Sequence, residues 1–211
     1  MFERKKYDSL EAASVRPSSV WNLSLISCGV SLDAFRSLLP QLTHLQVLRV
    51  GWQAWTELPK ELSELKELRS FTILNTPIKL FPVFLSSCPC LAELTLRGTD
   101  ISAIPTEVQD FRHLKHLDFS NNPVRQIPSE LSNLSELREL RLADNGLLML
   151  PTSISNMRKL RTLALAGNCF STTEAQKIQD WFPKEVVSVW SKDKMVVQPS
   201  VGGDGKPAPQ P

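Results

Sequence analysis

The chain has 211 residues, 42% of them hydrophobic, which is ordinary for one sizeable globular domain. Its formal net charge is only +2, so no strong field favours nucleic acid or an anionic membrane surface as the partner. No apolar run is long enough to span a bilayer, and the basic start of the chain lacks the apolar core of a secretory signal.

Residues 1–19 are predicted to form an N-terminal cap. Asp8 and Glu11 are spaced as a capping pair for a short helix that runs through Ala13. We expect Leu10 to pack against the structure that follows, because an uncovered end would expose apolar core.

The centre of the chain repeats with a fixed length. Copies of the segment LRELRLADN begin at Leu45, Leu68, Leu91, Leu114, Leu137 and Leu160, each 23 residues after the last. A looser copy of 25 residues begins at Val20. The Leu-x-Leu part of each copy predicts a short strand whose side chains alternate between core and surface. One copy cannot bury its own apolar residues, so the copies must stack.

The second half of the repeat carries an apolar residue followed by Pro. The five pairs are Leu58-Pro59, Phe81-Pro82, Ile104-Pro105, Ile127-Pro128 and Leu150-Pro151. Because Pro fixes φ near the helical value, each pair predicts the first turn of a short helical or 3-10 segment.

These copies resemble the leucine-rich repeat family, in the 23-residue class with LPxxIxxL in its second half. The resemblance covers residues 20 to about 190. It implies an α/β solenoid of about seven repeats over residues 20–170, with a curved parallel β-sheet on the concave face, short helical or 3-10 segments on the convex face, and helical caps. The flanks are similar to those of stand-alone bacterial proteins of the family.

The ninth position of the segment normally holds Asn in this family, and its amide satisfies backbone groups where the strand ends. Here the column reads Cys28, Gln53, Thr76, Thr99, Asn122, Asn145 and Asn168. Since the first four depart from Asn, we expect a less regular N-terminal half.

Residues 171–190 are predicted to form a C-terminal cap. Ser171 and Glu174 have the spacing of a capping box, and the helix presents Ala175, Ile178 and either Trp181 or Phe182 on its apolar face before Pro183 ends it. Val187 and Val189 are placed as a final edge strand. Residues 191–211 are predicted to be a flexible tail; the alternative is a ligand for a Pro-rich recognition module.

The four cysteines, Cys28, Cys88, Cys90 and Cys169, have no disulfide spacing and favour a reducing compartment. A metal site at Cys88 and Cys90 is the alternative, but no further ligand lies nearby in sequence. We expect no metal and no cofactor, and Cys88 to be a buried apolar residue.

No nucleophile, phosphate-loop or metalloprotease motif is present, so the chain is predicted not to be an enzyme. His44 and His113 fall between coils and are expected to be partial packing residues, with a role as ligands as the alternative. His116 and Asp118 share one face of a strand and could form an acid–base pair, but the shallow open surface implied by the fold favours no such chemistry.

The outward-facing positions of the repeat hold different residue types in successive copies, as expected of a surface adapted to one partner. Random drift on a surface without a function would give a similar pattern. Arg49, Trp52, Leu74 and Arg97 form the first candidate area. Its alternative is that Trp52 folds onto Trp55. The second candidate area alternates in charge and consists of Glu93, His116, Asp118, Glu139, Arg141 and Asp144. The alternative is that these residues are only a solvated polar face.

The sequence therefore predicts a non-enzymatic, cytoplasmic and monomeric protein-binding module or scaffold. Its concave face is expected to recognise a protein or peptide, and not nucleic acid, a membrane or a small molecule. Alternatives are a bacterial effector delivered into a host cell, the substrate-targeting part of a ubiquitin-ligase-type effector, an extracellular adhesin, and a eukaryotic scaffold of the small-GTPase signalling type.

Overall fold

The computed structural model describes residues 5–26 and 29–182, where the chain alternates strands with short helical segments. The strands are β1 (Lys5–Tyr7), β2 (Val20–Ile26), β3 (Val47–Gly51), β4 (Ser70–Leu74), β5 (Glu93–Arg97), β6 (His116–Asp118), β7 (Glu139–Arg141) and β8 (Thr162–Ala164). The α-helices are α1 (Leu10–Val15), α2 (Leu32–Leu38) and α3 (Thr172–Asp180). The 3-10 segments are η1 (Pro17–Ser19), η2 (Leu39–Gln41), η3 (Lys60–Glu64), η4 (Val83–Ser87), η5 (Thr106–Asp110), η6 (Ser129–Asn133) and η7 (Thr152–Asn156).

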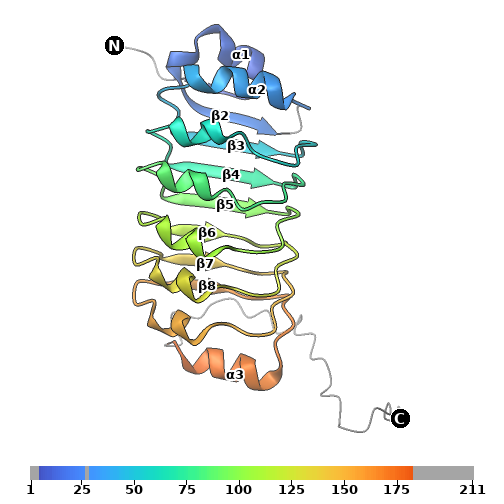
Figure 1. The fold of residues 1–211 in the computed structure, drawn as a ribbon, viewed down its shortest axis with the longest axis vertical. Coiled ribbons are helices and arrows are strands. Elements are labelled where there is room, and N and C mark those ends of the chain that lie inside the picture. Colours follow the sequence, from blue (N-terminus) through green and yellow to red (C-terminus); the bar gives the residue numbers. More distant parts are fainter. Residues whose placement is uncertain (1–4, 27–28, 183–211) are drawn as a thin grey trace, which may run out of the picture.

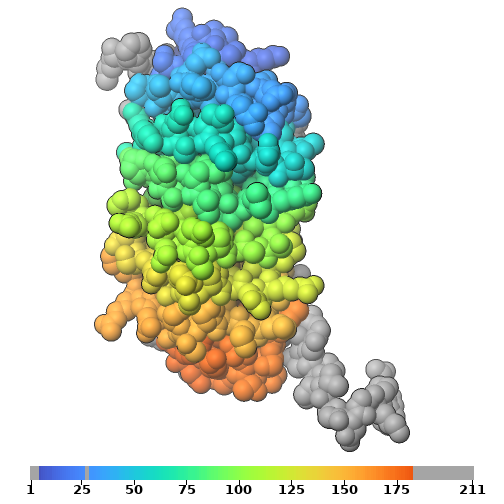
Figure 2. All heavy atoms as spheres, in the orientation of Figure 1, coloured from blue at the N-terminus to red at the C-terminus, as the bar shows by residue number. Residues whose placement is uncertain are grey.

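All eight strands form one sheet, and each pairs in parallel with its neighbours in sequence. From β3 onward a residue pairs with the residue 23 positions later, as Leu48 does with Phe71 and Phe71 with Leu94. The helices and 3-10 segments cover one face of this sheet, and each coil forms one band across the elongated molecule (Figures 1 and 2). The predicted solenoid of stacked coils is therefore confirmed.

The core lies between the sheet and the helical segments. Leu140 and Leu142 of one coil are both fully buried, and Leu137, which enters from the preceding turn, is 1% exposed. Burying each such side chain stabilises the fold by about 1.5–3 kcal/mol. At the N-terminal end, Phe35 of α2 stacks on Trp55 of the next coil with ring centroids 5.1 Å apart. Cys88, at 3% exposure, is a buried apolar residue, as expected.

Each 3-10 segment from η3 to η7 begins directly after the Pro of its repeat. Pro precedes the turn and is not its first helical residue, since Pro59 has an extended ψ of 132°. Its carbonyl oxygen opens the turn by accepting a hydrogen bond from the amide three residues later, at 3.2 Å between Pro59 and Leu62. The missing amide hydrogen of Pro costs nothing at this position.

The ninth-position column is buried and bonded in both halves of the molecule. The Asn122 amide nitrogen donates to the carbonyls of Leu96, Phe119 and Ser120, and its oxygen accepts from the amide of Thr99 at 2.8 Å. Gln53, with its longer side chain, donates to the carbonyls of Leu25 and Gly51 and accepts from Val30.

The expected irregularity of the N-terminal half is wrong for strands β3 to β5, whereas the pairing of β1 with β2 shifts register between Lys5 and Lys6. Strands β3 to β5 have five residues each and β6 to β8 have three. The physical reason is that Gln53 and Thr76 donate to backbone carbonyls as Asn does; the Thr76 hydroxyl, for example, donates to the carbonyl of Leu74 at 3.0 Å. Cys28 lies outside the described residues.

The N-terminal end differs from the sequence prediction in two respects. The cap of α1 is Ser9, whose hydroxyl accepts from the amide of Ala12 at 3.2 Å, so the assignment of Asp8 as the capping residue is wrong by one position. Strand β1, which extends the sheet beyond β2, was not predicted. The long first coil holds an α-helix, α2, followed directly by the 3-10 segment η2, in agreement with the helical or 3-10 segments that were predicted.

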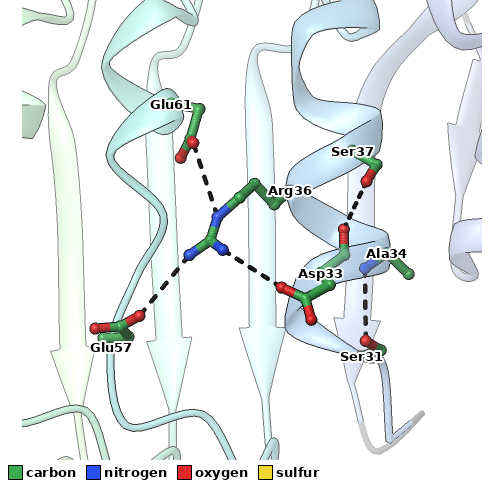
Figure 3. A network of polar contacts seen from close by, with 7 residues as sticks. All are labelled: Ser31, Asp33, Ala34, Arg36, Ser37, Glu57 and Glu61. Carbon is green, nitrogen blue, oxygen red and sulfur yellow. Dashed lines mark hydrogen bonds and ion pairs between the residues drawn. The ribbon is translucent and has the colours of Figure 1, made fainter.

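Helix α2 is fastened to the next coil by Arg36 (Figure 3). The Arg36 guanidinium lies 3.3 Å from Asp33 in the same helix, 3.8 Å from Glu57 and 3.7 Å from Glu61. Because the Arg36 side chain is 39% exposed, each pair contributes little alone, but together they orient the helix on the coil.

At the C-terminal end, α3 covers the last coil (Figure 1). The Ser171 hydroxyl accepts from the Glu174 amide at 3.1 Å, as the capping prediction requires. The Glu174 carboxylate, however, accepts from the amide of Leu150 in the preceding coil and so ties the helix to the stack. Ala175, Ile178 and Phe182 are buried. The predicted edge strand at Val187 and Val189 and the predicted tail lie outside the described residues.

Candidate functional site

The face of the sheet that the helices leave uncovered is called here the open face. It carries the third, fifth and seventh residues of each repeat, because side chains alternate along a strand. Arg49, Glu93, Arg97 and Arg141 are exposed on it, while the intervening leucines point into the core. All ten predicted site residues lie on this face or at the rim where its strands end.

The rim has one backbone conformation in six successive coils. The eighth residue of the repeat has a positive φ each time: Trp52 (53°), Asn75 (44°), Gly98 (66°), Asn121 (60°), Asp144 (53°) and Gly167 (72°). Gly, Asn and Asp tolerate this left-handed region, whereas an aromatic residue there is strained. Trp52 is therefore the exception in its column, and the sequence letters alone did not reveal the strain.

The first area groups Trp52 with neighbours on adjacent strands. The Trp52 amide donates to the carbonyl oxygen of Leu74 at 2.9 Å, and Leu74 pairs across the sheet with Arg97. Trp52 is 52% exposed. The alternative that it folds onto Trp55 is not supported, because Trp55 is 5% exposed and stacks on Phe35. We call Arg49, Trp52, Leu74 and Arg97 the aromatic patch.

Gly51 shapes the surface beside this patch. A Cβ atom at Gly51 would lie 3.0 Å from Cδ1 of Ile26 and 3.4 Å from Cβ of Leu74. The absence of a side chain at Gly51 therefore leaves room for the side chains of Ile26 and Leu74, which lie on the strands at either side of it. Ile26 was not among the predicted site residues, although its outward position was visible in the repeat register.

The second area is partly gathered into one shallow hollow of about 240 Å³. Its lining includes Glu93, Thr95, His116, Asp118, Glu139 and Arg141. Asp144 is not part of the lining and lies at the rim.

The acid–base pair of His116 and Asp118, which the sequence did not favour, does not form. The Nδ1 atom of His116 is hydrogen-bonded to Oε2 of Glu139 at 3.0 Å, and Arg141 forms an ion pair with the other oxygen of Glu139. Asp118 instead accepts from the amide of Ser120 at 3.0 Å. The hollow thus has a neutralised centre at Glu139, flanked by the carboxylates of Glu93 and Asp118.

Asn22 is a further residue that the sequence did not single out. It lies in an outward column of β2 but is only 7% exposed, and its side-chain oxygen has no hydrogen-bond partner in the described part of the chain. The residue stands between β1 and β3, pairing with Lys6 and Val47. Its burial could not be foreseen because β1 was not predicted.

Other candidate centres give no site. His44 and His113 are classed as exposed and so are at most partly packed; His44 is hydrogen-bonded to Glu67 at 2.8 Å. Over residues 5–26 and 29–182 no group of His, Cys, Asp and Glu is arranged to hold a metal ion. Within the same ranges no helix has the length and apolar character needed to cross a bilayer.

Comparison with known proteins supports the architecture. Residues 85–180 match the family model described as a leucine-rich repeat region. No curated protein matches the chain. A leucine-rich-repeat protein of Leptospira interrogans is similar in structure, with a TM-score of 0.72 and 26% identity over 88% of this chain. The chain spans 46% of that protein.

Two more distant structures share the fold. One is the leucine-rich-repeat ectodomain of a plant membrane receptor kinase from Arabidopsis thaliana, in complex with Casparian strip integrity factor 2 (TM-score 0.60, 22% identity, 72% of this chain and 22% of that one). The other is an internalin of Listeria monocytogenes (TM-score 0.57, 16% identity, 83% of this chain and 62% of that one). The 23-residue class remains a prediction, but the stacked parallel coils, the family match over residues 85–180 and the structural likeness together show that this chain has a leucine-rich-repeat architecture.

Proposed function

We propose that this chain is a non-enzymatic binding module that recognises a protein or peptide on the open face of its sheet. The Arabidopsis ectodomain, which has the same fold, is known in complex with another factor, so the fold is compatible with such a role. The shallow hollow of about 240 Å³ and the exposed strand residues offer a broad contact surface in place of an enclosed small-molecule pocket.

The strained backbone of Trp52 is the observation that carries the proposal. Five other coils place Gly, Asn or Asp at the same rim position, and one places an aromatic ring that is 52% exposed at φ 53°. Such strain costs about 1–3 kcal/mol and persists mainly where function requires it. Exposed Trp residues with neighbouring Arg are also the commonest hot spots of protein interfaces.

The two areas favour different groups on the partner. The aromatic patch joins the apolar surfaces of Trp52 and Leu74 to the charges of Arg49 and Arg97, so it suits an apolar side chain beside a carboxylate. The hollow offers the carboxylates of Glu93 and Asp118 and suits a basic side chain. A partner that presents an apolar side chain beside a carboxylate to the aromatic patch and a basic side chain to the hollow would therefore bind better than a uniformly charged partner.

The test compares three immobilised proteins in affinity capture from native lysate, with quantification by mass spectrometry. The face variant carries Trp52→Asn and Arg97→Gln. The matched control carries Val83→Asn and Arg125→Gln, which remove one exposed apolar group and one Arg away from the open face. We expect a protein that wild type and control capture equally and the face variant captures at least about tenfold less.

Capture that the control variant loses and the face variant keeps would contradict the proposal. Thermal unfolding of all three proteins ensures that each is folded. Asn is suitable at position 52 because Asn75 and Asn121 already adopt the same backbone conformation.

We also propose a cytoplasmic location. The described cysteines, Cys88, Cys90 and Cys169, are free thiols, as is usual in a reducing compartment. Cell fractionation tests this, and recovery of the protein outside the cytoplasm would contradict it.

A further inference from the structure

One long edge of the stack carries an excess of positive charge. The turns that lead into β6, β7 and β8 lie along this edge, on the left in Figure 1. Residues 112–115, 135–138 and 158–161 hold six Lys and Arg residues and one Glu. We call the six cations the basic edge: Arg112, Lys115, Arg138, Arg158, Lys159 and Arg161. All six are exposed.

The backbone fixes the spacing of these cations. The amide of Arg138 donates to the carbonyl of Lys115 at 2.8 Å, and the amide of Arg161 donates to the carbonyl of Arg138 at 2.7 Å. The three residues therefore stand in one column, about 4.8 Å apart as neighbouring strands are. Among described residues, Lys159 alone of the six uses its side chain in an ion pair, with Glu136.

The basic edge already stabilises one carboxylate. Hydrogen bonding and charge from Lys159, followed by the charges of Arg138 and Lys115, lower the pKa of the Glu136 carboxyl below its ordinary value. One carboxylate cannot neutralise six cations, so the edge has the capacity to pair with several more.

We propose that the basic edge binds an acidic, extended segment of a protein. Four of its six cations are Arg, whose planar guanidinium pairs with individual carboxylates through two hydrogen bonds. Side chains on one side of an extended segment recur about every 7 Å, within reach of long cationic side chains on strands about 4.8 Å apart. This surface is distinct from the open face of the proposed function.

Other polyanions fit the edge less well. Stacking of single-stranded nucleic acid needs exposed aromatic rings, and membrane attachment is strengthened by exposed apolar anchors. In the described part of the chain, the large exposed hydrophobic residues lie elsewhere: Val15, Trp52, Leu80, Val83, Leu148 and Met149.

The test measures fluorescence anisotropy of a labelled peptide of alternating Glu and Ser with the full chain. The edge variant carries Lys115→Ser, Arg138→Ser and Arg161→Ser. The control carries Lys60→Ser, Lys79→Ser and Arg125→Ser, three exposed cations elsewhere with the same change in net charge. Wild type and control should bind alike, and the edge variant should bind on the order of tenfold to a hundredfold more weakly.

Equal weakening of both variants would overturn the proposal, because net charge alone would then explain the binding. Tighter binding of single-stranded DNA or of phosphatidylserine vesicles than of the peptide, with loss in the edge variant, would overturn it as well. Circular dichroism and thermal unfolding of both variants should match wild type, since all substituted side chains are exposed. The open face is unchanged in the edge variant, so failure here leaves the proposed function standing.

Discussion

The backbone strain at Trp52 predicts which of two variants, Trp52→Ala or Trp52→Gly, is the more stable. Trp52→Ala and Trp52→Gly both remove the indole ring, so its lost contacts cancel when they are compared. Alanine held near φ 53° costs about 1–2 kcal/mol, because its Cβ approaches the following carbonyl oxygen. Glycine avoids this cost but loses about 0.5–1 kcal/mol to its more flexible unfolded chain. The glycine variant should therefore be the more stable by about 0.5–1 kcal/mol.

Differential scanning calorimetry measures the difference. For a chain of this size, about 1 kcal/mol shifts Tm by roughly 2–4 °C, so the glycine variant should melt about 1–4 °C above the alanine variant. Ala54→Gly is the control, since Ala54 is exposed and its φ is not positive. There glycine should lower Tm. An alanine variant at position 52 that equals or exceeds the glycine variant in Tm would refute the left-handed assignment and the argument built on it.

Three further predictions concern the described coils. Asn122→Ala leaves three buried carbonyls without their side-chain donor and should lower the free energy of unfolding, measured by chemical denaturation, by about 3 kcal/mol. The control Asn133→Ala removes an exposed hydrogen bond to Gln109 and should lower it by less than about 0.5 kcal/mol. Equal losses would exclude a structural role for the ninth-position column. Gly98→Ala should destabilise the fold by about 2 kcal/mol, because φ is 66° and the new Cβ would clash with Oδ1 of Asn75. Adding Asn75→Gly removes the clash but not the backbone strain, so it should recover only part of the loss. Gly146→Ala is the near-neutral control in the same thermal melts, since its new Cβ would have its nearest neighbour atom 3.4 Å away. Burial raises the pKa of Cys88 to about 11, so at pH 8 only about one thiol in a thousand is ionised. After iodoacetamide treatment of the native protein, peptide mapping should find the exposed Cys90 modified and Cys88 unmodified until the protein is unfolded. Rapid labelling of native Cys88 would contradict its burial.

The stacked sheet could be predicted from sequence because each coil repeats the same physical requirement. Leu140 and Leu142 must alternate into the core, and the residue 23 positions later must do the same in the next strand. Errors arose where a coil does not repeat. Asp8 and Glu11 have the spacing of a capping box, but the side chain that accepts the amide hydrogen bond of Ala12 belongs to Ser9, one residue later. Strand β1 has no counterpart among the repeats, so no register pointed to it.

The candidate site was predictable only in part, because an outward position does not determine which neighbours a side chain meets. His116 and Asp118 share a face of β6, yet His116 bonds to Glu139 on β7 and Asp118 bonds to its own backbone. Cross-strand neighbours, which lie close together, compete with residues two positions apart on one strand. The choice depends on rotamers, and the repeat pattern carries no information about them.

The backbone conformation at each position of the open face helps to decide which of the two candidate areas is the stronger binding centre. At the third, fifth and seventh positions of the repeat no described residue has a positive φ, so variation in residue type there is expected with or without a partner. The eighth position requires a positive φ, which restricts it to Gly, Asn or Asp in five coils, and only Trp52 stands against that restriction. In the hollow, by contrast, Glu139 is already paired with His116 and Arg141, and a partner would have to displace or share those contacts. The aromatic patch around Trp52, a half-exposed residue that alone in its described column puts a large side chain at a positive φ, is therefore the stronger of the two areas as a binding centre.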